Sequence, residues 1–323
     1  MFDTISLILM RQPTVALASY ALRVWNTDEH EADTVSDFAG GNDLFDFLKE
    51  FFSGLKKKPS HNKNERQLLR VKQLHVDGRK IYGTLETGEY GAESEIWDVT
   101  TEALAHTRKT TEADMIPFYF HADIPQGVDE GFLVLEKRGM MGMRHTLSRE
   151  VNSAFSKKFA DHTLRFDPLV EAEELEKYVR GKIESVHFVT FDIPKDIAEA
   201  FGAGHKEVKG RVELVIHARR GKSLPLNERL RRFVGADTPV SKWIALNELG
   251  YEYENVKIKS RVGGSRRTID LSRLDRLRSY HDISAEVEFD AKSGNPRFDS
   301  IHELANKLVR RVKRQVYKEN GRE

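Results

Sequence analysis

The segment that decides the fold class reads VKQLHVDGRKIYGTL and covers residues 71–85. Asp77-Gly78 lies between two β-prone runs, and this dipeptide is a strong short-range signal for a tight hairpin. An isolated hairpin is marginally stable in water, so further strands must complete a sheet. Residues 96–99, 116–120 and 131–135 are apolar and β-prone. We therefore expect an antiparallel sheet of about four or five strands.

Helical periodicity flanks this predicted sheet. Apolar residues recur at three- and four-residue spacing over 44–55, which is typical of an amphipathic helix, and Lys56-Lys57-Lys58-Pro59 ends it. The same spacing predicts helices over 143–159 and 304–317. Residues 14–25 are apolar throughout and fit either a strand or a helix. The fold class expected is α+β, with mainly antiparallel sheets and flanking helices.

A second β-rich region begins near residue 183, and 323 residues are enough for two domains. Its predicted strands are 186–191, 208–218, 251–262, 267–271 and 285–289. We expect an N-terminal α+β domain over 1–165 and a C-terminal α+β domain over 166–323.

The net charge of +1 hides an asymmetry between the two parts of the chain. Residues 205–323 hold 27 Lys and Arg against 17 Asp and Glu, whereas residues 1–204 hold 25 against 34. Such asymmetry indicates a polyanionic partner for the basic part. Alternatively, the two parts are complementary and dock on each other. A further hypothesis is that the acidic part screens the basic part until a polyanionic partner arrives.

Common catalytic signatures are missing from the sequence. The chain has no Cys, which excludes a disulfide, a thiolate metal site and a Cys nucleophile. It has no phosphate loop, dinucleotide fingerprint, H-E-x-x-H or G-x-S-x-G. No catalytic residue, cofactor or metal ligand is therefore predicted.

A metal-dependent nuclease remains the enzyme alternative. Such a site needs converging carboxylates and often a Lys. Glu252, Glu254 and Lys257 supply these types, as do Asp129-Glu130 with Glu136-Lys137. Alternating Glu and Lys on a strand more often marks a solvated face.

No apolar run is long enough to span a bilayer. Residues 1–10 are apolar but lack a basic lead, so we predict a strand there and not a targeting segment. The expectation is a cytoplasmic protein without direct membrane insertion.

The last helix is predicted to be basic along one side. Ile301, Leu304, Leu308 and Val312 form an apolar stripe, and beside it runs a second stripe of cations with no acidic residue from 307 to 318. Like charges at these spacings repel, and an anionic partner would relieve the repulsion. The alternative is the general preference for cations near a helix C-terminus.

Two further groups of cations precede this helix. Lys257, Lys259 and Arg261 alternate on a predicted strand, and a Gly-Gly-Ser turn leads directly to Arg266-Arg267. Such a finger could lie along a nucleic acid, or it could be an edge strand protected by charge. Residues 219–222 form another basic group.

Aromatic residues are sparse among these clusters, which favours contact with duplex phosphates over base stacking. We expect binding to double-stranded DNA to be weakly sequence-selective and steeply salt-dependent. A protein-interaction scaffold whose basic face meets an acidic partner is the other alternative. The predicted DNA-binding residues are Lys257, Lys259, Arg261, Arg266, Arg267, Lys307, Arg310, Arg311, Arg314, Lys318, Arg219, Arg220 and Lys222.

The middle of the chain resembles a known family. Three segments carry the resemblance: Ile116-Pro-Phe-Tyr-Phe120, Ile124-Pro125 and Gly131-Phe-Leu-Val-Leu-Glu-Lys-Arg-Gly139, followed by a helix ending near Phe159. They are similar to bacterial and prophage-encoded anti-phage defence proteins, among them the RexA-like phage-exclusion proteins. The resemblance covers residues 68–160. It implies a non-catalytic DNA-binding sensor that is homodimeric and works with a separately encoded membrane effector. It carries over no individual residue.

Overall fold

The computed structural model describes residues 14–169, 181–192, 209–225, 255–262, 265–270 and 280–319, and it divides the chain into two compact units. Unit 1 comprises residues 1–167 and 280–323, and unit 2 comprises residues 168–279. The strand predicted over residues 1–10 lies outside the described residues. The predicted α+β class with antiparallel sheets is confirmed.

The compact units differ from the predicted division at residues 165 and 166, because the chain returns to unit 1 after unit 2. Strand β16 (Tyr280–Asp282) pairs with β1 (Val15–Asn26). Helix α7 (Phe298–Glu319) packs on β1, β8 (Ile116–Asp123) and β9 (Gly131–Arg138). The basic C-terminal helix therefore belongs to the same unit as the N-terminal sheet.

A ten-stranded sheet forms the centre of unit 1, with the main order β11-β1-β9-β8-β5-β4-β3. Strands β2, β10 and β16 pair with β1 or β9 beside this path. The remaining bounds are β2 (Glu31–Asp33), β3 (Ser60–Asn62), β4 (Gln67–Asp77), β5 (Lys80–Glu89), β10 (Met141–Gly142) and β11 (His162–Pro168). Two helices, α1 (Leu44–Lys57) and α2 (Arg144–Lys158), confirm the predicted amphipathic segments.

The hairpin predicted at Asp77-Gly78 is confirmed as β4 and β5. Gly78 has a φ of 54°, a conformation that glycine adopts without a steric penalty. Gly83 is required for a different reason: the register shifts between Val71 and Gln73, and a Cβ at Gly83 would collide with the Gln73 carbonyl oxygen. The hairpin thus depends on two glycines with separate functions.

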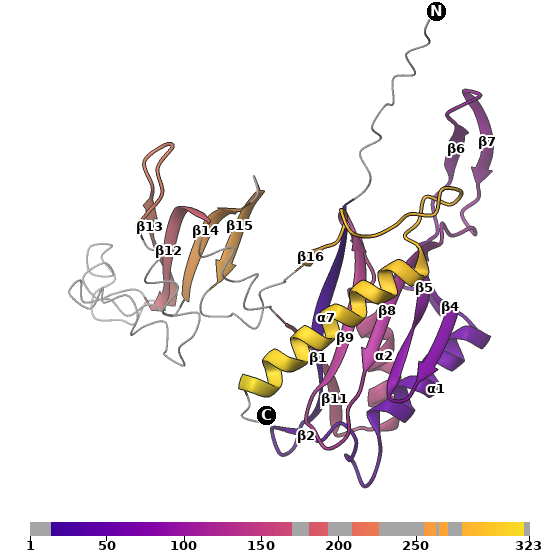
Figure 1. Ribbon diagram of the computed structural model, residues 1–323, viewed down its shortest axis with the longest axis horizontal. Helices are drawn as coiled ribbons and strands as arrows, with labels where there is room; N and C mark the ends of the chain where they lie inside the picture. The colour runs from indigo at the N-terminus through magenta and orange to yellow at the C-terminus, as the bar shows by residue number, and fades with distance from the viewer. Residues whose placement is uncertain are drawn as a thin grey trace, which may run out of the picture. The chain divides into compact units, whose positions relative to one another are not determined.

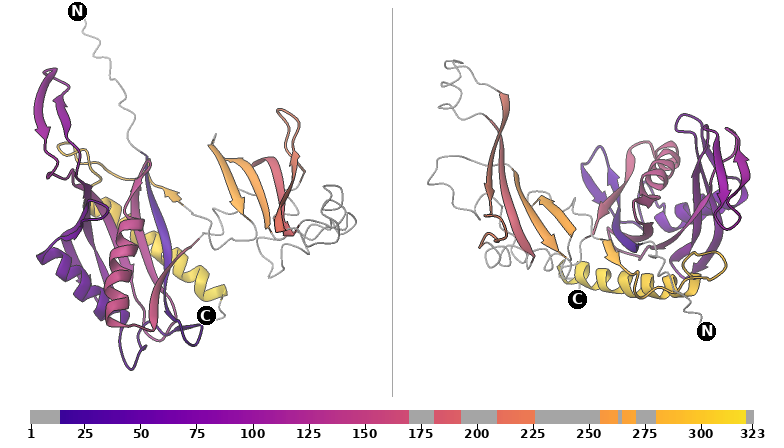
Figure 2. Two further views of the ribbon diagram at one scale, coloured as in Figure 1. Left: turned by 180° about the vertical axis from the view of Figure 1, so that it is seen from behind. Right: turned by 90° about the horizontal axis from the view of Figure 1, so that it is seen from above.

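Residues 94–108 differ from the prediction, because they do not join the main sheet. Strands β6 (Ser94–Asp98) and β7 (Ala103–Arg108) form a separate two-stranded ribbon that projects from the main sheet of unit 1 (Figures 1 and 2). Ile96, Trp97, Val99 and Leu104 are exposed on it.

Unit 1 has helices on both faces of its sheet (Figure 1). Helices α1 and α2 pack with one face in a core that includes Phe52, Phe120 and Phe155. Helix α7 covers the opposite face, where Phe132 contacts Tyr317 with ring centroids 6.1 Å apart. Strand β1 is buried on both sides, so its near-continuous apolar sequence is that of a central strand.

Unit 2 contains a four-stranded antiparallel sheet in the order β13-β12-β14-β15. Its strands are β12 (Lys182–Asp192), β13 (Lys209–His217), β14 (Asn255–Val262) and β15 (Ser265–Asp270).

The strand predicted at 285–289, which lies in unit 1, is wrong: the amides of Glu286 and Val287 both donate to the Ile283 carbonyl, which makes a turn. In the described part of the chain, no helix is long and apolar enough to cross a membrane.

A layer of polar aromatic side chains lies between α7 and the sheet. The Tyr119 hydroxyl is 2.7 Å from Nδ1 of His302 on α7 and 3.3 Å from Nδ1 of His121. His302 also stacks on Tyr82 with centroids 4.2 Å apart. His121 is fully buried, and its Nε2 has no hydrogen-bond partner among the described residues. Burial, together with repulsion from His302, Lys80 and Lys313, lowers the pKa of His121 to about 3.

We predict that unit 1 loses stability in mild acid. The pKa of His121 is depressed in the folded state, so the unfolded chain binds the extra proton as the pH falls below about 6.5. The loss reaches about 2 kcal/mol between pH 7.5 and 5. Chemical denaturation followed by circular dichroism at both pH values measures it.

His121→Phe should remove this part of the pH dependence, whereas His145→Gln, at an exposed histidine of α2, should keep it. An unchanged pH dependence in His121→Phe would show that another group is responsible.

Candidate nucleic-acid interface

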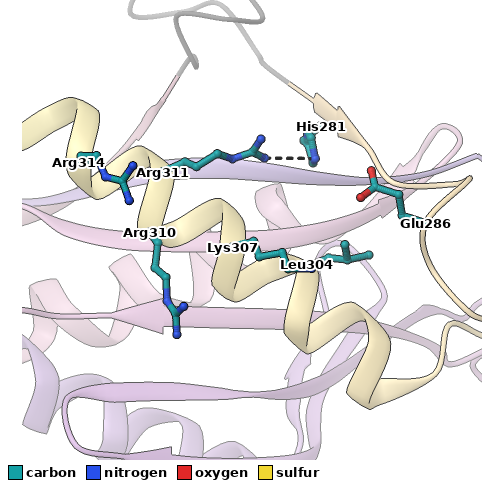
Figure 3. Close-up of a pocket in the computed structure, with 7 residues that line it drawn as sticks. All are labelled: His281, Glu286, Leu304, Lys307, Arg310, Arg311 and Arg314. Atoms are coloured by element: carbon teal, nitrogen blue, oxygen red, sulfur yellow. Dashed lines mark hydrogen bonds between the residues drawn. The ribbon is translucent and has the colours of Figure 1, made fainter.

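Helix α7 has an apolar side and a basic side, as its sequence predicted. Ile301, Leu304, Leu308 and Val312 are buried, and Ala305, Val309 and Val316 extend the same side. Lys307, Arg310, Arg311 and Arg314 are exposed on the remaining surface, which we call the α7 basic face (Figure 3). Burial of the apolar side fixes where these four cations point.

An open hollow of about 390 Å³ lies along the α7 basic face. The four cations line it together with His281, Glu286 and Leu304 (Figure 3). The Lys307 ammonium is 2.7 Å from Glu303, one turn earlier on the helix. The Arg311 guanidinium is 3.3 Å from Nε2 of His281. These two cations therefore already have neighbours within the protein.

Arg310 and Arg314 differ from the other two. Both are exposed, and neither forms an ion pair within the described part of the chain. Arg310 extends on the other side of the helix from Arg311 (Figure 3). Arg310 and Arg314 are four residues apart, which is about one helical turn, so their like charges repel. An anion near this face would interact favourably with both.

Lys313, which lies between these cations in sequence, points inward. Its ammonium is 3.0 Å from Oδ2 of Asp123, a carboxylate that is only 7% exposed. It also lies 5.8 Å from the centre of the Phe132 ring. Lys313 is therefore part of the contact between α7 and the sheet and not of the basic face.

In unit 2, the two strands predicted on either side of the Gly-Gly-Ser segment are present as β14 and β15, which pair antiparallel. Lys259 and Arg261 are exposed and Lys257 is half-buried. The register places Arg266 opposite Arg261 and Arg267 opposite Ser260. The side chains of Arg266, Arg267 and Lys318 lie outside the described part of the structure.

The basic turn after β13 is exposed at Arg219, Arg220 and Lys222. The Lys222 amide donates to the Arg219 carbonyl at 2.8 Å, which closes the turn. Lys182, a residue that the sequence did not single out, donates from its ammonium to the Gly221 carbonyl at 2.7 Å. A single Lys at the start of a strand carries no signal in the sequence, and only the packing of the turn against β12 reveals its position.

The predicted residues thus divide into two groups, one in each unit. Counted by unit, residues 168–279 hold 22 Lys and Arg against 17 Asp and Glu, and the rest of the chain holds 30 against 34. The charge contrast is smaller than the one predicted from the two parts of the sequence. The cations matter as local groups more than as the net charge of a domain.

The residues considered for a nuclease site have other contacts. Glu130 forms an ion pair with Arg23, and Glu136 with Arg138. Glu252 and Glu254 lie outside the described residues. Within the described ranges, no group of three or more His, Cys, Asp or Glu side chains is arranged to hold a metal ion.

Comparison with known protein families and with curated proteins gives no match for this chain. The resemblance of residues 68–160 to RexA-like proteins therefore stays a prediction. The candidate interface rests on the charges and contacts described above.

We predict effects of very different size for two neighbouring cations of α7. Lys313→Met leaves the buried Asp123 carboxylate unpaired and should lower the free energy of unfolding by about 3 kcal/mol. Arg314→Met removes an exposed charge and should change it by less than about 0.5 kcal/mol. Urea denaturation of both variants makes the comparison.

The double variant Asp123→Leu/Lys313→Met should recover much of the loss, because no buried charge then lacks a partner. Equal stability of the two single variants would contradict the inward position of Lys313.

Proposed function

We propose that this protein binds double-stranded DNA through its phosphates, without a catalytic step, as the sensing component of a bacterial anti-phage defence system. The observation that carries the DNA-binding part is the α7 basic face, with Arg310 and Arg314 exposed and free of ion pairs within the described residues.

The physical argument begins with the rigidity of the helix. Residues 307–314 span about 10 Å along the axis, at about 1.5 Å per residue. A DNA duplex carries one negative charge per about 1.7 Å of its axis, so several phosphates fall within this length. Because the opposite side of α7 is buried, the cations are held in position before a ligand arrives.

The chemistry of the hollow favours backbone contact over base reading. The seven side chains that line it include no Phe, Tyr or Trp on which a base could stack. Glu286 lines the same hollow, and Glu303 pairs with Lys307 at its edge. These carboxylates limit the attraction, so we expect moderate affinity that falls steeply with salt and depends little on sequence.

The setting in anti-phage defence rests on the resemblance of residues 68–160 to RexA-like proteins. On the same basis we propose a cytoplasmic homodimer that works with a separately encoded membrane effector. A basic face also suits an acidic protein, and the experiment below distinguishes that scaffold function from DNA binding.

We predict that Arg310→Glu/Arg314→Glu weakens binding to a labelled random 60-bp duplex at least tenfold at 100 mM salt. Loss of two phosphate contacts should also reduce the slope of log affinity against log salt by about 1.8. Fluorescence anisotropy across a salt series measures both quantities.

The matched control is Lys56→Glu/Lys57→Glu, which changes the net charge equally at exposed positions of α1, on the other face of the sheet. It should reduce binding far less than the α7 variant. Equal loss in both variants would mean that only net charge matters. No binding even at 20 mM salt would favour the scaffold, and cleavage with magnesium would favour the nuclease.

A further inference from the structure

The small sheet of unit 2 gathers positive charge at one end of its strands. Lys182 begins β12, and it is paired in register with Arg261 near the end of β14. Ser185 is paired with His217, so the turn of residues 219–222 that follows β13 returns to this same end. We call Lys182, Arg219, Arg220, Lys222 and Arg261 the cationic end. Two clusters far apart in sequence are therefore brought together by the strand pairing.

The turn is held firmly against β12. The Ala218 amide donates to the Glu184 carbonyl at 2.8 Å, and the Leu224 amide donates to the Ile183 carbonyl at 3.0 Å. The Ile183 amide donates to the Ser223 hydroxyl at 2.9 Å. Gly221 has a φ of 83°, and its carbonyl accepts from Lys182. Four contacts thus fix a turn that carries three exposed cations, so little order has to be gained on binding.

Acidic groups are distributed unevenly along the sheet. At the cationic end, Arg261 pairs with Glu184 at 2.8 Å. Arg219, Arg220 and Lys222 form no ion pair within the described part of the chain. Toward the opposite end, Asp192 is paired in register with Lys209, and Asp270 with Lys257. Each of these register pairs joins an acidic and a basic residue, whereas Arg219, Arg220 and Lys222 have no such partner among the described residues.

We infer that the cationic end is a second phosphate-binding surface, which takes the sugar–phosphate backbone of the same nucleic acid as the α7 basic face. The identity of the polyanion rests on the proposed function, and the existence of the surface rests on the geometry of unit 2 alone. A chain with one such surface in each unit binds long DNA bivalently. The second contact is then intramolecular, and its high effective concentration raises the overall affinity.

Bivalence makes the effect of a mutation depend on DNA length. At about 3.4 Å per base pair, a duplex of about 60 bp is roughly 200 Å long and one of about 8 bp is roughly 27 Å long, and we expect the short duplex to engage one surface at a time. On the short duplex each surface binds by itself, and the loss of one surface leaves the other. On the long duplex the loss of either surface removes the bivalent gain.

The test compares Arg219→Glu/Arg220→Glu/Lys222→Glu with wild type on both duplexes across a salt series. We expect the affinity for 60 bp to fall at least thirtyfold and the salt slope to decrease by about 2.7. The affinity for 8 bp should fall less than threefold. Circular dichroism of the full chain confirms that the variant is folded.

A gain-of-function variant gives a result that misfolding cannot imitate. Glu184→Gln removes the carboxylate that pairs with Arg261, and it should strengthen binding to 60 bp two- to fivefold with a steeper salt slope. If neither Glu184→Gln nor the triple variant alters binding to 60 bp, the cationic end is not a binding surface.

The outcomes separate this inference from the proposed function. If Arg310→Glu/Arg314→Glu abolishes DNA binding and the triple variant has no effect, the proposed function stands and the second surface does not. If the triple variant abolishes binding and the α7 variant has no effect, the cationic end binds DNA and the α7 basic face does not. If both variants lose much more affinity for the 60-bp duplex than for the 8-bp duplex, the result supports bivalent binding.

Discussion

The contact between α7 and strands β1, β8 and β9 determines the form of unit 1. Helices α1 and α2 cover only one of the two faces of the sheet. The apolar side of α7 buries the other, and each large side chain contributes about 1.5–3 kcal/mol relative to exposure. The basic face follows from this packing, because residues that cannot be buried must remain on the outer surface of the helix.

The polar groups beneath α7 make the same contact more specific than apolar packing alone. Lys313 must meet Asp123, and His302 must meet Tyr119, so the helix has one favourable position along the sheet. A shift by one turn would leave the Asp123 charge buried without a partner. The orientation of Arg310 and Arg314 is therefore set by residues on the opposite side of the helix.

Local patterns in the sequence predicted the local structure well. The Asp77-Gly78 hairpin, the amphipathic helix at 44–55 and both sides of α7 follow from spacing and turn chemistry. The assignment of β1 was open, because a strand buried on both faces lacks alternation. The return of residues 280–319 to unit 1 and the position of Lys182 depend on long-range pairing, which single-sequence patterns do not contain.

The late position of α7 in the chain has a consequence for biosynthesis. The sheet is complete up to β11 about 150 residues before the helix ends, and at about 5–20 residues per second this interval lasts roughly 8–30 s. During that time one apolar face of the sheet has no cover, so the nascent chain is a natural client for a ribosome-associated chaperone. An mRNA truncated within the region that encodes unit 2 would yield an aggregation-prone sheet that lacks α7.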